Sequence, residues 1–401
     1  MKRTLPLLLA ACAFLARPAL ALAGTGTDPL RDVQQYNFSI HILAMLVVGF
    51  GFLMVFVRRY AYGATTGTYL VVGTAIPAYL FLRAWGGLSA APIAPDSVSA
   101  LLLAEFACAS ALIAMGAVLG RLRLHQYFLL AAVLVPVYML NEWLVLEHGL
   151  GVTKGFVDSA GSIVIHAFGA YFGLGLALGL TRAEDRKKPV ESDETSDRFS
   201  MIGSMVLWIF WPSFCSAVVP TADMPRTLIA TVLALCGATL ATVLASGLLR
   251  KGKPSYTDIA NAALAGGVAV GATCNVISPA GALLVGALAG TLSVVGYVLI
   301  QPRLDKGLRI VDTCGVHNLH GMPGLLGGVA AIVVIPGIAK PQLIGIGVTV
   351  ALAFAAGSLG GALIRATGKK RAVYEDGEEF AGAPVEAPVA LHAAPEEQKA
   401  A

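Results

Sequence analysis

Charged residues are scarce in this 401-residue sequence, in which Asp, Glu, Lys and Arg make up only 13%. Hydrophobic residues make up 57%, and the mean hydropathy is +0.76. A soluble domain carries about 25% charged residues, so this composition excludes an ordinary soluble protein. The formal net charge is +4 and no basic face is clustered in the sequence. We therefore expect no nucleic-acid partner.

Cysteine is also scarce, and its spacing excludes two further classes of site. The six cysteines form no CxxC motif, which argues against a thiolate zinc site or a disulfide framework. The chain also lacks HExxH and a GxSxG nucleophile context, so we expect neither an enzyme nor a cofactor. His317 and His320 share a helix face at i and i+3 and are an alternative metal site. No carboxylate or thiolate motif converges on them, and we predict no metal.

Long apolar windows are what the sequence does contain. Eleven windows can each cross a hydrocarbon core, which takes about 20 residues; they begin near residues 37, 66, 98, 127, 159, 200, 226, 258, 278, 312 and 341. Lipid forces such segments to be helical, because a helix satisfies its own backbone polar groups. We predict an all-α polytopic membrane protein with eleven transmembrane helices. Basic clusters such as Arg58 with Arg59, and those in 182–188, follow the positive-inside rule with the N-terminus outside and the C-terminus inside.

Both ends of the chain differ from this apolar body. Residues 1–23 combine Lys2, Arg3, an apolar stretch and a small-x-small site, which predicts a cleaved signal peptide. Arg17 interrupts the stretch, so an uncleaved anchor remains an alternative. Residues 24–371 form the predicted membrane domain. Residues 372–401 are rich in Ala, Pro and Glu, and we predict a disordered cytoplasmic tail.

One short segment occurs twice, as DSAGSIVIH at 158–166 and as DTCGVHNLH at 312–320. The first falls in the fifth predicted span and the second in the tenth, which run in opposite directions. This arrangement predicts an inverted five-plus-five repeat with the substrate site near the midplane. Asp158 and Asp312 each precede an apolar helix body, where a carboxylate caps the first-turn amides.

Placing a histidine inside a bilayer costs free energy, so such residues usually mark an ion path or a proton relay. His166 follows its aspartate by 8 residues and His317 follows its aspartate by 5, which carries both toward the middle at ~1.5 Å per residue. Neutral imidazoles pair as one donor and one acceptor. We predict that His166 and His317 face each other in a narrow pore. The alternative is a pair of core histidines bonded to neighbouring carbonyls.

Four segments resemble the ammonium transporter and Rhesus superfamily, on its Rhesus branch. They are GSIVIHAFGAYFGLGLAL at 161–178, MIGSMVLWIFWPSF at 201–214, NAALAGGVAVG at 261–271 and DTCGVHNLHGMPGLLGG at 312–328. The resemblance covers the mature chain except the tail and implies a bacterial member in the inner membrane. It also implies a homotrimer in which each protomer has its own pore.

The resemblance implies a role for each matching residue. His166 and His317 match the twin histidines of the conduction pore, and Phe106 and Phe214 match a stacked phenylalanine gate. Asp158 matches the structural acid that supports admission of the substrate. Further implied residues are Glu142 in the outer vestibule, with Asp312 and His320 in supporting positions. Leu146 and Val218 depart from the Trp and Ser of the ammonium-transporter branch, which weakens cation capture, and the effect of Cys215 is not predicted.

The function implied is passive conduction of NH3 after ammonium loses its proton at the phenylalanines. An ion crossing a dry path pays several kcal/mol that a neutral molecule does not. Three alternatives remain open: net NH4+ transport through a histidine proton relay, conduction of CO2 or another neutral gas, and a sensor coupled through the tail.

Overall fold

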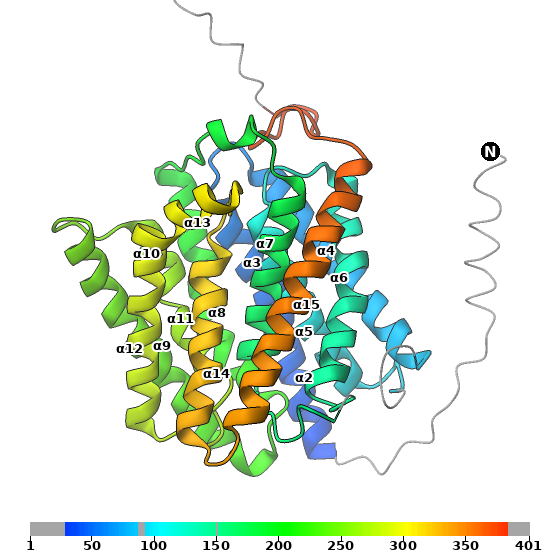
Figure 1. Cartoon of the computed structure of the whole chain (residues 1–401), viewed down its shortest axis with the longest axis vertical. Helices are drawn as coiled ribbons and strands as arrows, with labels where there is room; N and C mark the ends of the chain where they lie inside the picture. Colours follow the sequence, from blue (N-terminus) through cyan, green and yellow to red (C-terminus); the bar gives the residue numbers. More distant parts are fainter. Residues whose placement is uncertain (1–28, 87–92, 150, 384–401) are drawn as a thin grey trace, which may run out of the picture.

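The computed structural model describes residues 29–86, 93–149 and 151–383. Within these ranges every regular element is a helix and no strand occurs. Figure 1 shows the helices packed side by side in one upright bundle. The predicted signal peptide at 1–23 and residues 384–401 of the predicted tail lie outside the described residues. The prediction of an all-α fold is confirmed.

Nine helices of the described chain are long and apolar enough to cross a membrane. This establishes a multi-pass architecture. Several spans contain a short π-helical or 3₁₀ segment beside the main helix. The nine spans are Pro29–Phe56, containing α2 (Pro29–Ala44) and α3 (Phe50–Leu53); α4 (Ala61–Ala84); α5 (Val98–Ala117); α6 (Leu124–Val145); Ser162–Leu180, containing α7 (Phe168–Leu180); α8 (Glu194–Ser216); Thr221–Leu249, containing α9 (Met224–Leu249); Pro279–Leu308, containing α12 (Pro279–Val295) and α13 (Gln301–Leu308); and α15 (Ala339–Ala366).

The windows predicted near residues 258 and 312 contain shorter helices. The first is broken into α10 (Tyr256–Ala262) and α11 (Ala265–Val270). The second consists of a π-helical turn at His317–Gly321 followed by α14 (Met322–Val334). The turn carries HNLHG, whose polar residues lower the hydropathy of this segment. Neither reaches the ~20 residues of a regular span.

Glycines bring the backbones of neighbouring helices into contact. A Cβ on Gly324 of α14 would lie 2.4 Å from the Ser162 carbonyl oxygen, and one on Gly327 would lie 2.3 Å from that of Ala269. The same holds between α9 and α12, where a Cβ on Gly286 would lie 2.0 Å from the Ala234 oxygen. Small residues permit such close approach. The helices therefore pack tightly at these positions.

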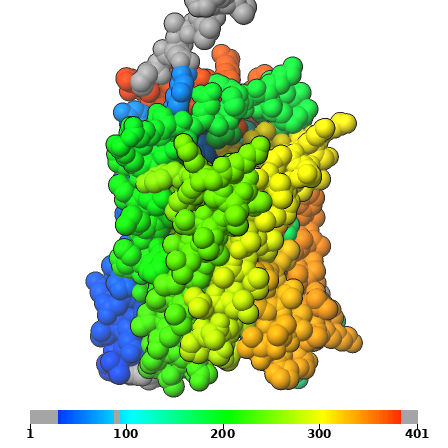
Figure 2. Space-filling model, turned by 90° about the vertical axis from the view of Figure 1, so that its left-hand side faces the viewer, coloured from blue at the N-terminus to red at the C-terminus, as the bar shows by residue number. Residues whose placement is uncertain are grey.

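Figure 2 shows the face on which the green and yellow segments of α9 and α12 lie side by side. Large apolar side chains project from both helices. Such a surface suits contact with lipid tails and is not a soluble surface. The exposed residues include Leu228, Ile229, Leu240, Leu244, Leu283, Leu284 and Leu288.

The first part of the predicted disordered tail is ordered, which corrects that prediction for residues 372–383. The Tyr374 backbone N–H donates to the Gly120 carbonyl, and its ring is buried. The Asp376 carboxylate accepts the backbone N–H groups of Tyr62 and Gly63 at 2.9 and 2.8 Å, which caps the first turn of α4. Composition gave no sign of these contacts, because each depends on a backbone group elsewhere in the fold.

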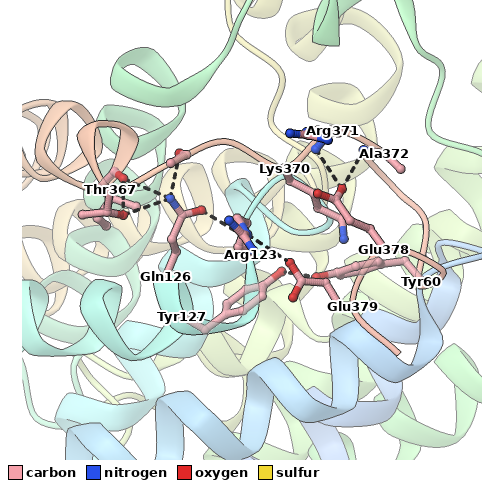
Figure 3. Close-up of polar contacts among 12 residues, drawn as sticks. Tyr60, Arg123, Gln126, Tyr127, Thr367, Lys370, Arg371, Ala372, Glu378 and Glu379 are labelled. Atoms are coloured by element: carbon pink, nitrogen blue, oxygen red, sulfur yellow. Dashed lines mark hydrogen bonds and ion pairs between the residues drawn. The ribbon is translucent and has the colours of Figure 1, made fainter. Parts of the chain in front are cut away.

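Figure 3 shows the segment that leads from α15 into this tail. Glu378 folds back to accept the backbone N–H groups of Arg371 and Ala372, both at 2.8 Å. Lys370 is fully buried and lies over the Tyr60 ring, 5.2 Å from its centroid. Burial lowers the pKa of the Lys370 amine, and the neighbouring carboxylates of Glu379 and Glu378 partly oppose this shift. Residues 372–383 therefore close over one end of the bundle.

Candidate functional site

The first repeated segment begins a helix deep inside the bundle. Its helix starts at Ser162 with a π-helical turn, Ser162–Ala167, after Gly161 takes a positive φ of 79°. The Oδ2 atom of Asp158 accepts the backbone N–H groups of Ile163 and Val164 at 2.9 and 2.8 Å. These bonds confirm that Asp158 satisfies amides of the first turn. They fix where the helix begins and therefore how far inside His166 lies.

The second repeated segment is built in the same way. Gly315 stands three residues after Asp312, as Gly161 does after Asp158, and it also has a positive φ, of 67°. Asp312 accepts the Val316 N–H on Oδ1 at 3.0 Å and the His317 N–H on Oδ2 at 3.1 Å. Only glycine takes this conformation without strain. The shared aspartate and glycine therefore have one structural cause, a capped turn before a buried helix.

A histidine from each segment meets in the interior. The His166 and His320 rings are stacked, with centroids 5.4 Å apart and planes 7° apart, and their Nδ1 atoms lie 3.3 Å from each other. They are 3% and 4% exposed. The two Nδ1 atoms can share one proton if one ring donates and the other accepts. Each ring comes from a π-helical turn, a feature often found at functional sites.

The predicted pairing of His166 with His317 is therefore wrong in its second member. His317 is the first residue of its helix, and its ring packs edge-on against Tyr171 with centroids 5.7 Å apart. The prediction counted helical rise from Asp312, although residues 312–316 form a turn. Alignment of the two nine-residue segments carried the correct signal, because His166 and His320 are both their ninth residue.

Small apolar cavities lie on both sides of the histidine pair. One, of about 10 Å³, is lined by His166 together with Ile42, Ala109, Trp211 and Phe214, among others. The other, of about 20 Å³, is lined by His320 with apolar residues that include Phe50, Ile113 and Leu319. Neither volume exceeds that of one or two small molecules. The site is therefore a buried histidine pair between two small apolar cavities.

Phe106 and Phe214 are in contact next to the cavity that His166 lines. Their ring centroids are 4.7 Å apart with planes at 59°, and the centroid of Phe214 lies 5.8 Å from that of the His166 ring. Both are 3% exposed, and their role as a gate stays a prediction.

Two aromatic residues of the site were missed by sequence reasoning. Trp211 stacks on His166 at 5.5 Å, and Phe50 stacks on His320 at 6.4 Å. The position of Trp211 three residues before Phe214, on one helix face, was an available signal. Phe50 had none, since it comes from a helix with no repeated motif.

Glu142 lies in a buried polar cluster between α4 and α6. It accepts the Tyr79 hydroxyl at 2.8 Å, and the neighbouring pair of Arg83 and Glu147 is 2.6 Å apart. Glu142 is 6% exposed. The geometry gives it a structural partner, and its role in admitting a cation stays a prediction.

Metal ligands do not gather around the site. Across 29–86, 93–149 and 151–383 no group of three or more His, Cys, Asp or Glu side chains is arranged to hold an ion. The cysteines in these ranges are free thiols.

Comparison with known proteins gives a consistent result. Residues 30–382 match the Ammonium Transporter Family. The chain is 39% identical to ammonium transporter Rh type B of Mus musculus over 357 residues, which cover 81% of this chain and 77% of that protein. Its structure is similar to that of Nitrosomonas europaea Rh50, a member of the Rhesus protein family of channels. The TM-score is 0.87, the sequences are 60% identical, and the match covers 92% of this chain and 95% of that one.

Two other matches are partial, one in the length it covers and one in sequence identity. The chain covers 60% of the length of ammonium transporter Rh type C-like 2 of Danio rerio, to which it is 38% identical over 304 residues. A sensor Amt protein matches with a TM-score of 0.73 at 17% identity. That similarity concerns the fold alone.

Proposed function

The chain belongs to the ammonium transporter family, and on that basis we propose that it is a Rhesus-type channel that conducts ammonia across a membrane. The observation that carries the proposal is the contact between His166 and His320. These rings meet between two small apolar cavities, 154 residues apart in the chain. A buried polar pair in an otherwise apolar passage suits a small molecule that both donates and accepts hydrogen bonds.

The mechanism follows from what such a passage excludes. Ammonium transfers its proton to water outside Phe106 and Phe214, and the ring pair excludes that water from the cavity beyond. NH3 then enters the cavity that His166 lines, exchanges hydrogen bonds with His166 and His320, and leaves through the cavity that His320 lines. An unpaired ion in this apolar space would lose several kcal/mol of hydration. Neutral passage therefore has the lower barrier.

The acids have different parts in this proposal. Asp158 and Asp312 hold the two histidine-bearing turns in place through their backbone hydrogen bonds. Glu142 attracts ammonium electrostatically toward the mouth of the passage. His317 borders the path on the side of Tyr171.

The resemblance supports further proposals about the assembly. The two shorter segments at 256–270 and 317–334 complete eleven crossings arranged as an inverted five-plus-five repeat. The N-terminus lies outside, and the tail covers the cytoplasmic end. The chain forms a homotrimer in a bacterial inner membrane, a point that native mass spectrometry in detergent tests.

Two other fluxes use the same site chemistry. If the histidine pair relays the proton that ammonium sheds, the net species transported is NH4+. If the passage selects only for small size and neutrality, CO2 crosses as well.

Proteoliposomes that contain a pH-sensitive dye distinguish these fluxes. An inward ammonium gradient is applied while current is recorded on a supported membrane made from the same vesicles. Neutral NH3 flux alkalinises the lumen without a sustained current, whereas NH4+ transport gives a sustained current. A CO2 pulse in a third arm gives channel-dependent acidification if CO2 crosses. Absence of any ammonia flux above that of empty vesicles would contradict the proposal.

A further inference from the structure

The helix α2 reaches both helices that carry the phenylalanine pair. It packs against α5, which carries Phe106, and against α8, which carries Phe214. Three polar contacts cross these interfaces. One lies at the start of α5, where the Ser99 hydroxyl donates to Oε1 of Gln35 at 2.8 Å. The other two each involve the residue directly before a phenylalanine.

The first contact joins α2 to α5. The Ser39 hydroxyl donates to Oε1 of Glu105 at 2.5 Å, and Glu105 precedes Phe106 in the chain. Ser39 is 2% exposed and Glu105 is fully buried. Oε2 of Glu105 has no hydrogen-bond partner in the described part of the chain. The Ser39 hydroxyl is therefore the contact that fixes the direction of this carboxyl group.

The second contact joins α2 to α8. His41 Nδ1 and Ser213 Oγ are hydrogen bonded at 2.9 Å, and Ser213 precedes Phe214. The His41 ring also stacks on Phe210, one turn earlier on α8, with centroids 4.8 Å apart. The stacking holds the imidazole at a fixed height, so its nitrogen reaches a defined point on α8.

The geometry of α2 explains how one helix makes both contacts. His41 follows Ser39 by two positions, which is about 3 Å of rise and about 200° of rotation in an α-helix. The side chains therefore point to opposite sides of α2. On α5 and α8, the preceding residue is turned about 100° from the phenylalanine, so it faces α2 while the ring faces the passage.

From this arrangement we propose that Ser39 and His41 are positioning residues that hold Phe106 and Phe214 against each other. We call the four residues Ser39, Glu105, His41 and Ser213 the gate brace. A rigid brace keeps the ring centroids at 4.7 Å and water out of the cavity below. When a brace contact is lost, α5 or α8 is free to rotate, and the rings separate. The brace determines selectivity against water, and this inference deepens the proposed function on which it rests.

The test compares water and ammonia permeability in the same proteoliposomes by stopped-flow light scattering and by lumenal pH. The variants are Ser39→Ala, Ser213→Ala and their combination. Ser39→Thr is the conservative rescue, because threonine retains the hydroxyl. Thr74→Ala is the matched control, since its hydroxyl bonds only within α4, to the Leu70 carbonyl at 2.7 Å. Thermal unfolding in detergent checks that each variant is folded.

We expect water permeability to rise about threefold in each single variant and further in the combination, because a loosened constriction admits water. Ser39→Thr and Thr74→Ala should match the wild type. An additional cycle pairs Ser39→Ala with Glu105→Leu, whose effects on water permeability should not add, since each change removes the same hydrogen bond.

Unchanged water permeability in the folded double variant would overturn the inference. If the double variant does not fold, Ser213→Ala alone decides, because it leaves His41 stacked on Phe210 and removes only one hydroxyl. If the brace variants raise water permeability but the wild type shows no ammonia flux, the proposed function is rejected and the positioning role stands. If the wild type conducts ammonia but the brace variants leave water permeability unchanged, the positioning role is rejected and the proposed function stands.

Discussion

Replacement of the two aspartates by asparagine should have unequal effects, because they use their oxygens differently. Asp158 accepts both backbone N–H groups on Oδ2, and its Oδ1 has no partner in the described residues. Asp312 accepts one N–H group on each oxygen. An asparagine has a single acceptor oxygen. It can replace Asp158 with both bonds kept, but at position 312 its NH2 group must face one of the two N–H donors.

The magnitude follows from these contacts. Loss of the charge at either position weakens a helix N-terminal interaction by about 0.3–1 kcal/mol. At position 312 one buried N–H group also loses its acceptor, which costs about 1–3 kcal/mol. Asp312→Asn should therefore be the less stable variant by about 1–3 kcal/mol. At roughly 2 °C per kcal/mol, the scale for large domains, its Tm should lie about 2–6 °C below that of Asp158→Asn.

Intrinsic-fluorescence thermal unfolding of both purified variants in one detergent measures this difference. Wild-type protein and Asp96→Asn are run beside them; Asp96 lies in the connection before α5 and is a control for loss of charge alone. Equal Tm values for the two variants, or a lower one for Asp158→Asn, would refute the reasoning from oxygen use.

The remaining predictions concern packing, the tail and the phenylalanine pair. Gly324→Ala places a Cβ 2.4 Å from the Ser162 oxygen, so it should destabilise the fold by about 1–3 kcal/mol, whereas Gly347→Ala, with nothing within 4 Å, should be neutral or stabilising when Tm values are compared. Burial lowers the Lys370 pKa below its ordinary value of 10.5, so its charged form disfavours the folded state at neutral pH and the penalty is relieved as pH rises toward 10.5. Lys370→Met should therefore raise Tm at pH 7 and flatten the wild-type gain between pH 7 and pH 10; a lower Tm at pH 7 would contradict this. Phe214→Ala should raise water permeability in proteoliposomes at least about as much as loss of a brace contact, because it opens the constriction itself.

Much of the fold followed from solvent physics alone. A chain this apolar must form helices in lipid, so the all-α fold and most span positions were predictable from hydropathy. The capped turns were predictable too, since Asp158 with Gly161 and Asp312 with Gly315 are local signals. The break at 263–264 was harder to predict, because the apolar pattern continues through it.

Some contacts between the candidate site residues were predictable. Phe106 contacts Phe214 as the resemblance implied, whereas His166 meets His320 and not His317. The error came from assuming that a helix begins at its capping aspartate. The contact of His41 with Ser213 could not be predicted, because it depends on how α2 packs against α8 and no local sequence pattern indicates that.

The tail shows a different limit. Its acidic and alanine-rich composition is typical of disorder, yet Asp376 and Tyr374 bind backbone groups of distant segments. Composition indicates the free-energy cost of ordering a segment, but it does not indicate which backbone groups elsewhere in the fold bind that segment.

Ammonia permeability of proteoliposomes containing His166→Leu, His320→Leu or His317→Leu tests the central claim most directly. Leucine keeps the passage apolar and removes the hydrogen bonds that the imidazoles offer to NH3. The account predicts that the first two variants each lose about tenfold or more of the permeability, equivalent to ~1.4 kcal/mol in the barrier, and that His317→Leu stays near the wild type. Loss of permeability in His317→Leu with wild-type flux through His320→Leu would contradict the account.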